Sequence, residues 1–134
     1  MEKATAISGF RDLRVWQSAM DLVERVYRVT HSFPKEELYG LTSQLRRAAV
    51  SIPSNVAEGH TRKHSKEFLQ HLSMAQASLA EVQTQLEIAF RLHFMTNPEF
   101  DEIVGVAISL AKQLYALRNA IRGRMVLGSP SPNP

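Results

Sequence analysis

The stretch FLQHLSMAQASLAEVQTQLEIAFRLH, residues 68–93, carries the clearest structural signal in this chain. Seven apolar residues and a terminal histidine recur in it at alternating spacings of four and three: Phe68, Leu72, Ala75, Leu79, Val82, Leu86, Ala89 and His93. At about 100° per residue these positions share one narrow side of a helix. The pattern predicts a helix of roughly seven turns that packs along other long helices. We interpret His93 as a partly buried residue at its end.

Residues 13–31 predict an earlier helix with an unusually wide apolar face. One stripe contains Leu13, Trp16, Met20, Val23 and Tyr27, and the stripe beside it contains Val15, Ala19, Leu22, Val26 and Val29. Together they cover about half of the circumference, more than the stripe of an ordinary surface helix. Such a helix needs two sets of neighbours, its own bundle and a second subunit. We predict that the subunit interface contains Val15, Leu22, Val26 and Val29.

Residues 38–59 predict a second helix, with Leu41, Leu45, Ile52 and Val56 on one face. Pro53 lies inside this pattern, and the apolar residues keep their phase across it. We therefore expect a kink at Pro53 rather than a helix end. Gly59 is expected to terminate the helix, because glycine is favoured just beyond helix ends.

Asn97 and Pro98 predict the start of a fourth helix with a wide apolar face. Four helical patterns, short connections and no strand alternation predict an all-α fold, an antiparallel up-down-up-down four-helix bundle. We place the bundle at residues 10–125. A flexible lead-in over residues 1–9 and a disordered tail over residues 126–134 are expected to flank it.

The composition limits the possible classes of protein. A length of 134 residues suits one domain, and the absence of cysteine favours a reducing compartment. No stretch has the form of a secretory signal or a membrane span, so we expect a soluble, cytoplasmic protein without a membrane partner. The formal net charge of +3 is compatible with an anionic partner but does not require one.

No stretch of the sequence indicates a catalyst. The nucleophile, phosphate-loop and metalloprotease motifs are absent, and the five histidines lack the spacing of a metal site. We predict that the protein is not an enzyme and that it holds no metal or cofactor.

Basic residues suggest a contact with nucleic acid. Arg46 and Arg47 lie on the second helix, and Arg62, Lys63 and Lys66 lie in or beside the loop that follows it. Guanidinium and ammonium groups near a helix N-terminus bind phosphates. The alternative interpretation is a solvated basic rim that keeps the protein soluble. Only two aromatic residues, Tyr39 and Phe68, are near these positions in the sequence, which gives little support to base stacking.

A polar cluster surrounds Pro53. Ser51, Ser54, Asn55 and Glu58 lie on one side of the second helix although they are modest helix formers. They are expected either to bond the backbone freed by Pro53 or to form hydrogen bonds across a subunit contact. An unfilled cavity near them would instead indicate a small-molecule site in the core or in an axial channel.

Three segments carry a resemblance to a known family. They are FRDLRVWQ (residues 10–17), FPKEELYGLTSQLRRAAVSIPSNVAEG (residues 33–59) and EFLQHLSMAQASLAEVQTQL (residues 67–86). They resemble the four-helix-bundle family first noticed as open reading frames within intervening sequences of bacterial large-subunit ribosomal RNA genes. The resemblance implies a homopentamer, a closed ring of bundles, and no enzymatic activity. A related branch, accessory proteins of diversity-generating retroelements, binds nucleic acid and a reverse transcriptase through a basic surface.

These observations support one leading hypothesis and two alternatives. The leading hypothesis is a non-enzymatic, oligomeric bundle that binds RNA or DNA weakly through its basic residues. The first alternative is a scaffold that binds another protein through an apolar surface. The second is a protein that binds a small molecule near Ser51, Asn55 and Glu58.

Overall fold

Four long α-helices make up most of the computed structural model, which describes residues 9–127. They are α1 (Arg14–Thr30), α2 (Leu41–Thr61), α3 (Ser65–Arg91) and α4 (Asn97–Leu127), and the 3-10 turns η1 (Phe10–Asp12) and η2 (Lys35–Glu37) precede α1 and α2. The lead-in predicted over residues 1–9 and the tail predicted over residues 126–134 fall almost entirely outside the described residues.

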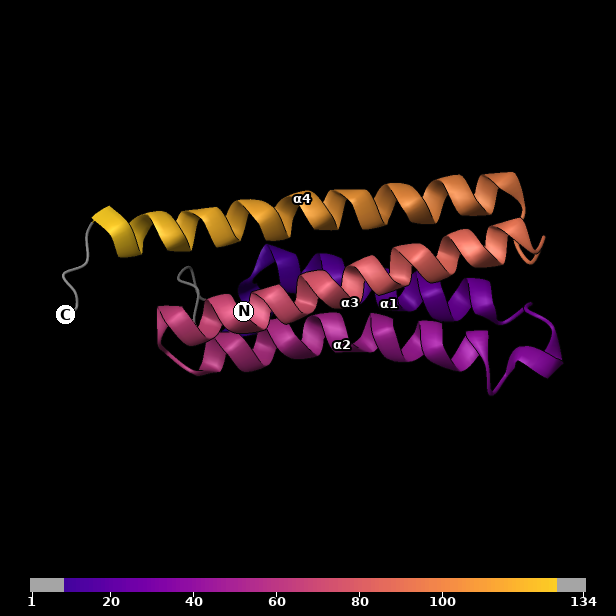
Figure 1. The fold of residues 1–134 in the computed structure, drawn as a ribbon, viewed down its shortest axis with the longest axis horizontal. Helices are drawn as coiled ribbons and strands as arrows, with labels where there is room; N and C mark the ends of the chain where they lie inside the picture. Colours follow the sequence, from indigo (N-terminus) through magenta and orange to yellow (C-terminus); the bar gives the residue numbers. More distant parts are fainter. Residues whose placement is uncertain (1–8, 128–134) are drawn as a thin grey trace, which may run out of the picture.

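The helices form the predicted up-down bundle. Each helix packs against the next one in the chain, and α1 also packs against α4, which closes the bundle (Figure 1). Successive helices run in opposite directions and are joined by short connections. The all-α class and the antiparallel arrangement predicted from the sequence are therefore confirmed.

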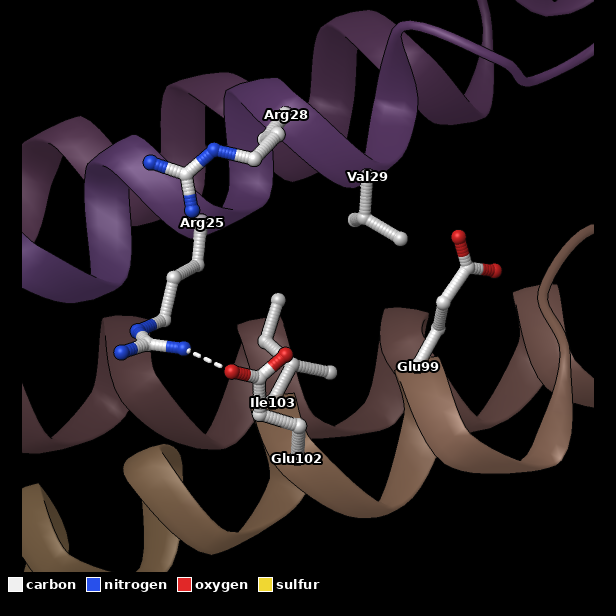
Figure 2. A pocket seen from close by; sticks show the side chains of 6 residues that line it. All are labelled: Arg25, Arg28, Val29, Glu99, Glu102 and Ile103. Atoms are coloured by element: carbon white, nitrogen blue, oxygen red, sulfur yellow. Dashed lines mark hydrogen bonds and ion pairs between the residues drawn. The ribbon is translucent and has the colours of Figure 1, made fainter.

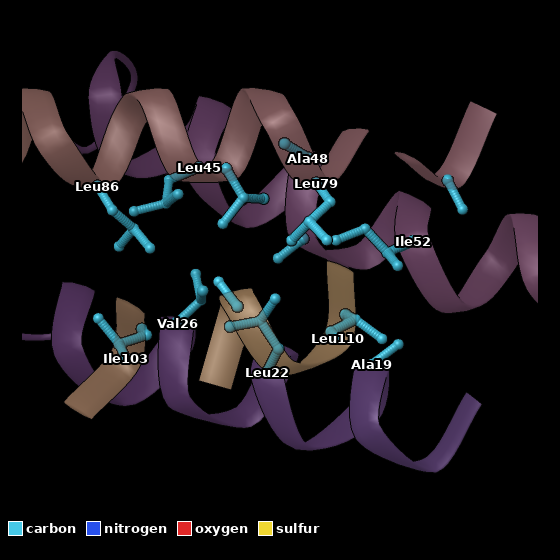
Figure 3. Close-up of a cluster of buried hydrophobic side chains, with 14 of the residues drawn as sticks. Ala19, Leu22, Val26, Leu45, Ala48, Ile52, Leu79, Leu86, Ile103 and Leu110 are labelled. Atoms are coloured by element: carbon cyan, nitrogen blue, oxygen red, sulfur yellow. The ribbon is translucent and has the colours of Figure 1, made fainter. Parts of the chain in front are cut away.

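The core follows the predicted apolar seams. On α3, the six positions from Leu72 to Ala89 in the four-three register are buried, and Phe68 packs half-buried at the edge of the core. Leu22, Leu45, Leu86 and Leu110 come from the four different helices and meet in the centre of the bundle (Figure 3).

His93, however, is exposed, so its predicted partial burial is wrong. The reason is that α3 ends at Arg91 and the chain turns away at His93, whose φ is 65°.

The predicted subunit interface on α1 is wrong. Val15, Leu22, Val26 and Val29 are all buried inside the single chain, with at most 9% of any of them exposed. These branched side chains fit closely between α2 and α4, whereas the neighbouring stripe with its bulkier aromatic and thioether groups faces outward. From that stripe, Met20 is 37% exposed and Tyr27 is 44% exposed, and Trp16 and Val23 are half-buried.

Helix α2 differs from its prediction at both ends. It begins at Leu41, whose backbone N–H donates to Glu37 Oε1 at 3.1 Å, and it continues through Pro53 to Thr61. Gly59 does not end the helix. A Cβ at Gly59 would lie 2.6 Å from the Cβ of His71. Glycine is therefore required there by the close approach of α3 rather than by a turn.

A capping box fixes the start of α4. The Thr96 N–H donates to Glu99 Oε1 at 2.9 Å, and the Glu99 N–H donates to Thr96 Oγ1 at 3.2 Å. Each side chain thus satisfies a backbone donor that the first helical turn leaves free. The predicted helix start at Asn97 is confirmed, with Thr96 supplying the cap. Within residues 9–127, no helix is both long and apolar enough to cross a membrane.

Candidate nucleic-acid interface

Basic residues from three separate segments gather at one end of the bundle. The start of α1, the connection between α2 and α3 and the last turns of α4 all lie at this end (Figure 1). We call it the basic end, and its cations are Arg11, Arg14, Arg62, Lys63, Lys66, Arg118, Arg122 and Arg124.

The basic end holds more positive charge than the whole chain. Its eight cations face only three described carboxylates, those of Asp12, Glu58 and Glu67, which leaves an excess of five positive charges. The formal net charge of the chain is +3, so the remainder of the molecule is acidic. The small net charge of the chain thus hides an uneven distribution, with the positive charge concentrated at one end. The electric field of this distribution attracts polyanions to that end.

The structure divides the predicted phosphate-binding set in two. Arg62, Lys63 and Lys66 lie together at the basic end, whereas Arg46 and Arg47 lie about 15 residues earlier on α2, roughly 22 Å along its axis. The five residues therefore do not lie together on one surface, and phosphate binding by each of them stays a prediction.

Arg46 has a structural contact of its own. Its Nε donates to Thr30 Oγ1 at 2.9 Å, and its guanidinium lies 4.6 Å from the centre of the Tyr27 ring. Both partners belong to α1, so Arg46 fastens α2 to α1 through a hydrogen bond and a cation–π contact. Arg47, one residue later, is exposed.

Sequence reasoning missed the cations that α1 and α4 bring to this end. Arg11, Arg14, Arg122 and Arg124 are exposed, and Arg118 is half-buried. They are far from the α2–α3 connection in the sequence and reach it only through the antiparallel order of the helices. The predicted topology could have located these cations. In an up-down bundle, the start of the first helix and the end of the fourth lie beside the second connection.

The loop of the basic end is held by Glu58. Its Oε2 accepts from Arg62 Nη2 at 3.2 Å, and its Oε1 lies 3.8 Å from His71 Nε2. His71 Nδ1 lies 3.0 Å from the Glu67 carbonyl oxygen. A carbonyl oxygen only accepts, so Nδ1 is the donor in this contact. Glu58 is thus part of the loop support, while its partner Arg62 remains largely open to solvent.

Lys63 and Lys66 are the exposed cations of this loop. The backbone of Lys63 has a φ of 66°, a conformation that residues other than glycine and asparagine rarely adopt. Within the described part of the chain, neither ammonium forms an ion pair, and both residues are exposed. Lys63 directly follows Arg62, the C-cap of α2, a position at which helices commonly end in this left-handed conformation. The exposed ammonium groups of Lys63 and Lys66 are accessible to an anionic partner.

The polar cluster around Pro53 is not one site. Ser51 Oγ, Ser54 Oγ and Asn55 Nδ2 each donate at 2.9 Å to a backbone carbonyl of α2, three or four residues earlier. The hydroxyls of Ser51 and Ser78 also share a hydrogen bond, which links α2 to α3. Proline at position 53 leaves the carbonyl of Ala49, four residues earlier, without its helical donor. The three neutral side chains bond the carbonyls of Ala48, Val50 and Ser51 instead, so the interpretation that they bond the backbone freed by Pro53 is wrong. Glu58 belongs to the basic end instead.

An apolar groove runs between α1 and α2. It has a volume of about 320 Å³ and is lined by Trp16, Met20, Val23, Val50, Pro53, Ser54 and Ala57. Met20 is 37% exposed and Val50 is 40% exposed, and they come from the two helices that form the groove. The outward-facing stripe of α1 and the proline-containing part of α2 form the walls of the groove. An apolar partner would bind at this surface.

A smaller pocket lies between α1 and α4, beside an ion pair that links the two helices (Figure 2). Arg25 donates from Nε to Asp21 Oδ2 at 3.0 Å and from Nη1 to Glu102, and these hydrogen bonds raise the pKa of Arg25 above its usual value. Glu99 on the other side of the pocket serves the capping box. The pocket measures only about 130 Å³, and two of its four charged residues, Arg25 and Glu102, form an ion pair.

Comparison with known proteins agrees with this architecture. A family profile described as "23S rRNA-intervening sequence protein" matches residues 11–116. The fold is similar to a crystal structure of a protein of unknown function from the S23 ribosomal protein family of Bacteroides thetaiotaomicron. The TM-score is 0.72 at 18% identity, over 78% of this chain and 95% of the other. The search of curated proteins found no match.

Proposed function

Because the chain belongs to the 23S rRNA-intervening sequence protein family, we propose that it is a non-enzymatic protein that binds RNA at its basic end. The observation that carries this proposal is the excess of five positive charges assembled there from three segments. The expected contacts are to phosphates, with Arg62, Lys63 and Lys66 at the centre of the surface.

The chemistry of the basic end favours backbone contacts over base reading. Phe68, the aromatic residue nearest to the loop, is half-buried and meets the His60 ring edge-on at 5.7 Å between centroids. It packs on the core and offers no free face for stacking. Affinity at this end therefore depends on charge, and counterion release makes it steeply sensitive to salt.

The proposal is tested by reversing charge at the loop and at matched positions elsewhere. In the double variant Arg62→Glu/Lys63→Glu, the formal net charge falls from +3 to −1. The double variant Lys35→Glu/Lys112→Glu has the same net charge, but both exposed positions lie outside the basic end. Fluorescence anisotropy with a labelled single-stranded RNA measures the affinity of each.

We expect the affinity of wild type, with about four phosphate contacts to single-stranded RNA, to fall roughly 50-fold between about 50 and 200 mM salt. The loop variant should bind at least tenfold more weakly than the matched control. No binding of wild type at low salt, or equal losses in the two variants, would refute the proposal.

We further propose that copies of the chain associate through the apolar groove between α1 and α2. The observation that supports this is the exposed apolar residues on both walls of the groove. A homopentamer, which the resemblance implies, would need such a contact. Met20→Glu/Val50→Glu should then convert the assembly to monomers in sedimentation velocity. Ile108→Glu, at a similarly exposed apolar residue on α4, should leave it intact. A wild-type monomer at micromolar concentration would refute self-association.

A further inference from the structure

A second groove, polar in character, lies between α2 and α3 away from the basic end. It has a volume of about 570 Å³ and is lined by Tyr39, Ser43, Gln44, Arg47, Ala48, Ser51 and Glu81. Neither the phosphate-binding surface nor the self-association groove proposed above uses any of these residues. It combines an aromatic ring, a guanidinium, an amide and a carboxylate within one open depression.

Tyr39 is the most unusual member of the groove. It is 93% exposed, more than any other large apolar residue in residues 9–127. It lies between the turn η2 and the start of α2, so it contributes almost nothing to the core of the single chain. An aromatic ring held at the edge of a groove and open on its faces is the platform on which an unpaired base stacks.

Arg47 supplies an uncommitted guanidinium beside this ring. Among the described residues, Arg47 lies within 4 Å of no carboxylate, although Glu81 lines the same groove. Its neighbour Arg46, in contrast, is held against α1 by Thr30 and Tyr27. A guanidinium with free donors binds a phosphate through two parallel hydrogen bonds.

Two residues that line the groove, Gln44 and Glu81, make only long hydrogen bonds to the buried amide of Gln85. Gln85 is 6% exposed, and its Nε2 makes only long contacts, 3.5 Å to Gln44 Oε1 and 3.4 Å to Glu81 Oε2. Its own Oε1 is buried without a partner in the described structure. Because these contacts are long, Gln44 and Glu81 keep hydrogen-bonding capacity for a ligand in the groove.

From these observations we infer that the groove binds one unpaired nucleotide. The base stacks on Tyr39, its edge meets the amide of Gln44 and the carboxylate of Glu81, and its phosphate lies on Arg47. The nucleotide comes either from a single-stranded RNA that also contacts the basic end or from solution as a free mononucleotide. The RNA source rests on the proposed function, whereas the free nucleotide does not.

The experiment measures binding of an unstructured RNA of about 12 nucleotides, a length typical of single-strand sites. Tyr39→Ala should weaken binding about tenfold, the size of effect expected for one stacked base, and Tyr39→Phe should retain it. Tyr115→Ala, at an exposed tyrosine on α4 outside the groove, is the matched control and should bind as wild type does. An RNA duplex should be insensitive to Tyr39→Ala, because its bases are already stacked.

The outcomes separate this inference from the proposed function. If Arg62→Glu/Lys63→Glu weakens RNA binding but Tyr39→Ala binds as wild type does, the nucleotide site is refuted and the basic end stands. If wild type binds no RNA, titration with AMP, GMP, CMP and UMP decides the matter by calorimetry. Binding of one of them that Tyr39→Ala abolishes supports the site, and binding of none of them refutes it.

Discussion

The replacement Gly59→Ala tests the close approach of α2 and α3 beneath the basic end. Gly59 lies inside α2, where alanine is intrinsically more stable than glycine by about 1 kcal/mol. In this structure, however, the added Cβ would lie 2.6 Å from the Cβ of His71 and 3.1 Å from Phe68 Cδ1. Because the Cβ of His71 is fixed to its backbone, rotation of the side chain gives no relief, and the two helices must separate.

The expected magnitude follows from these opposing terms. Overpacking of a tight contact costs about 1–3 kcal/mol, and a clash between two fixed Cβ atoms belongs at the upper end of this range. After the gain in helix propensity, Gly59→Ala should destabilise the protein by about 1–2 kcal/mol and lower Tm by roughly 4–8 °C.

Gly105→Ala is the matched control. Gly105 is an exposed glycine within α4, and a Cβ added there would meet no atom within 4 Å. It should stabilise the protein by about 0.5–1 kcal/mol through helix propensity alone. Urea and thermal unfolding, followed by circular dichroism at one fixed protein concentration, measure both changes. If Gly59→Ala stabilises the protein as Gly105→Ala does, the close approach of α2 and α3 is incorrect.

Three further predictions concern single residues. Thr96→Ala removes half of the capping box and should cost about 1 kcal/mol in urea unfolding; no loss would mean that the α4 start is not held by Thr96 and Glu99. Lys63→Gly should stabilise the protein by about 0.5–1 kcal/mol, because glycine adopts a positive φ without strain, and should weaken RNA binding at the same time. Arg46→Gln should lower stability by about 1 kcal/mol through its lost contacts to α1, whereas Arg47→Gln should not, and equal effects would contradict their different roles.

The fold was predictable because its strongest signal is local. Residues 68–93 determine their own helix through a four-three register, and the buried residues from Leu72 to Ala89 follow it. The end at His93 was not predictable in the same way. A periodic pattern continues past the point where the chain must turn, and only the packing of α4 shows that α3 stops at Arg91.

Which stripe of α1 faces the core could not be read from its apolar residues alone. Both stripes are apolar, and the choice depends on how closely α2 and α4 approach. Val15 and Leu22 fit that spacing and are buried, while Met20 and Tyr27 remain outside. Gly59 presents the same difficulty, since a glycine required by a neighbouring helix and a glycine required by a turn look identical in a sequence.

The candidate site was only partly predictable. Arg62, Lys63 and Lys66 are adjacent in the sequence, so their proximity needed no tertiary information. The separation of Arg47 from them follows from the rise of α2, and the addition of Arg122 and its neighbours follows from topology. If the charged residues are placed on the predicted order of the helices, the basic end can be located from the sequence.

The salt dependence of RNA affinity tests the central claim most directly. The double variant Lys63→Gln/Lys66→Gln removes two exposed ammonium groups from the basic end. If both bind phosphate, the slope of log K against log salt should become shallower by about 1.4 for a single-stranded RNA, relative to wild type. Lys35→Gln/Lys112→Gln should leave the slope unchanged. A slope equal to that of wild type in the Lys63/Lys66 variant would contradict the assignment of the basic end as the RNA-binding surface.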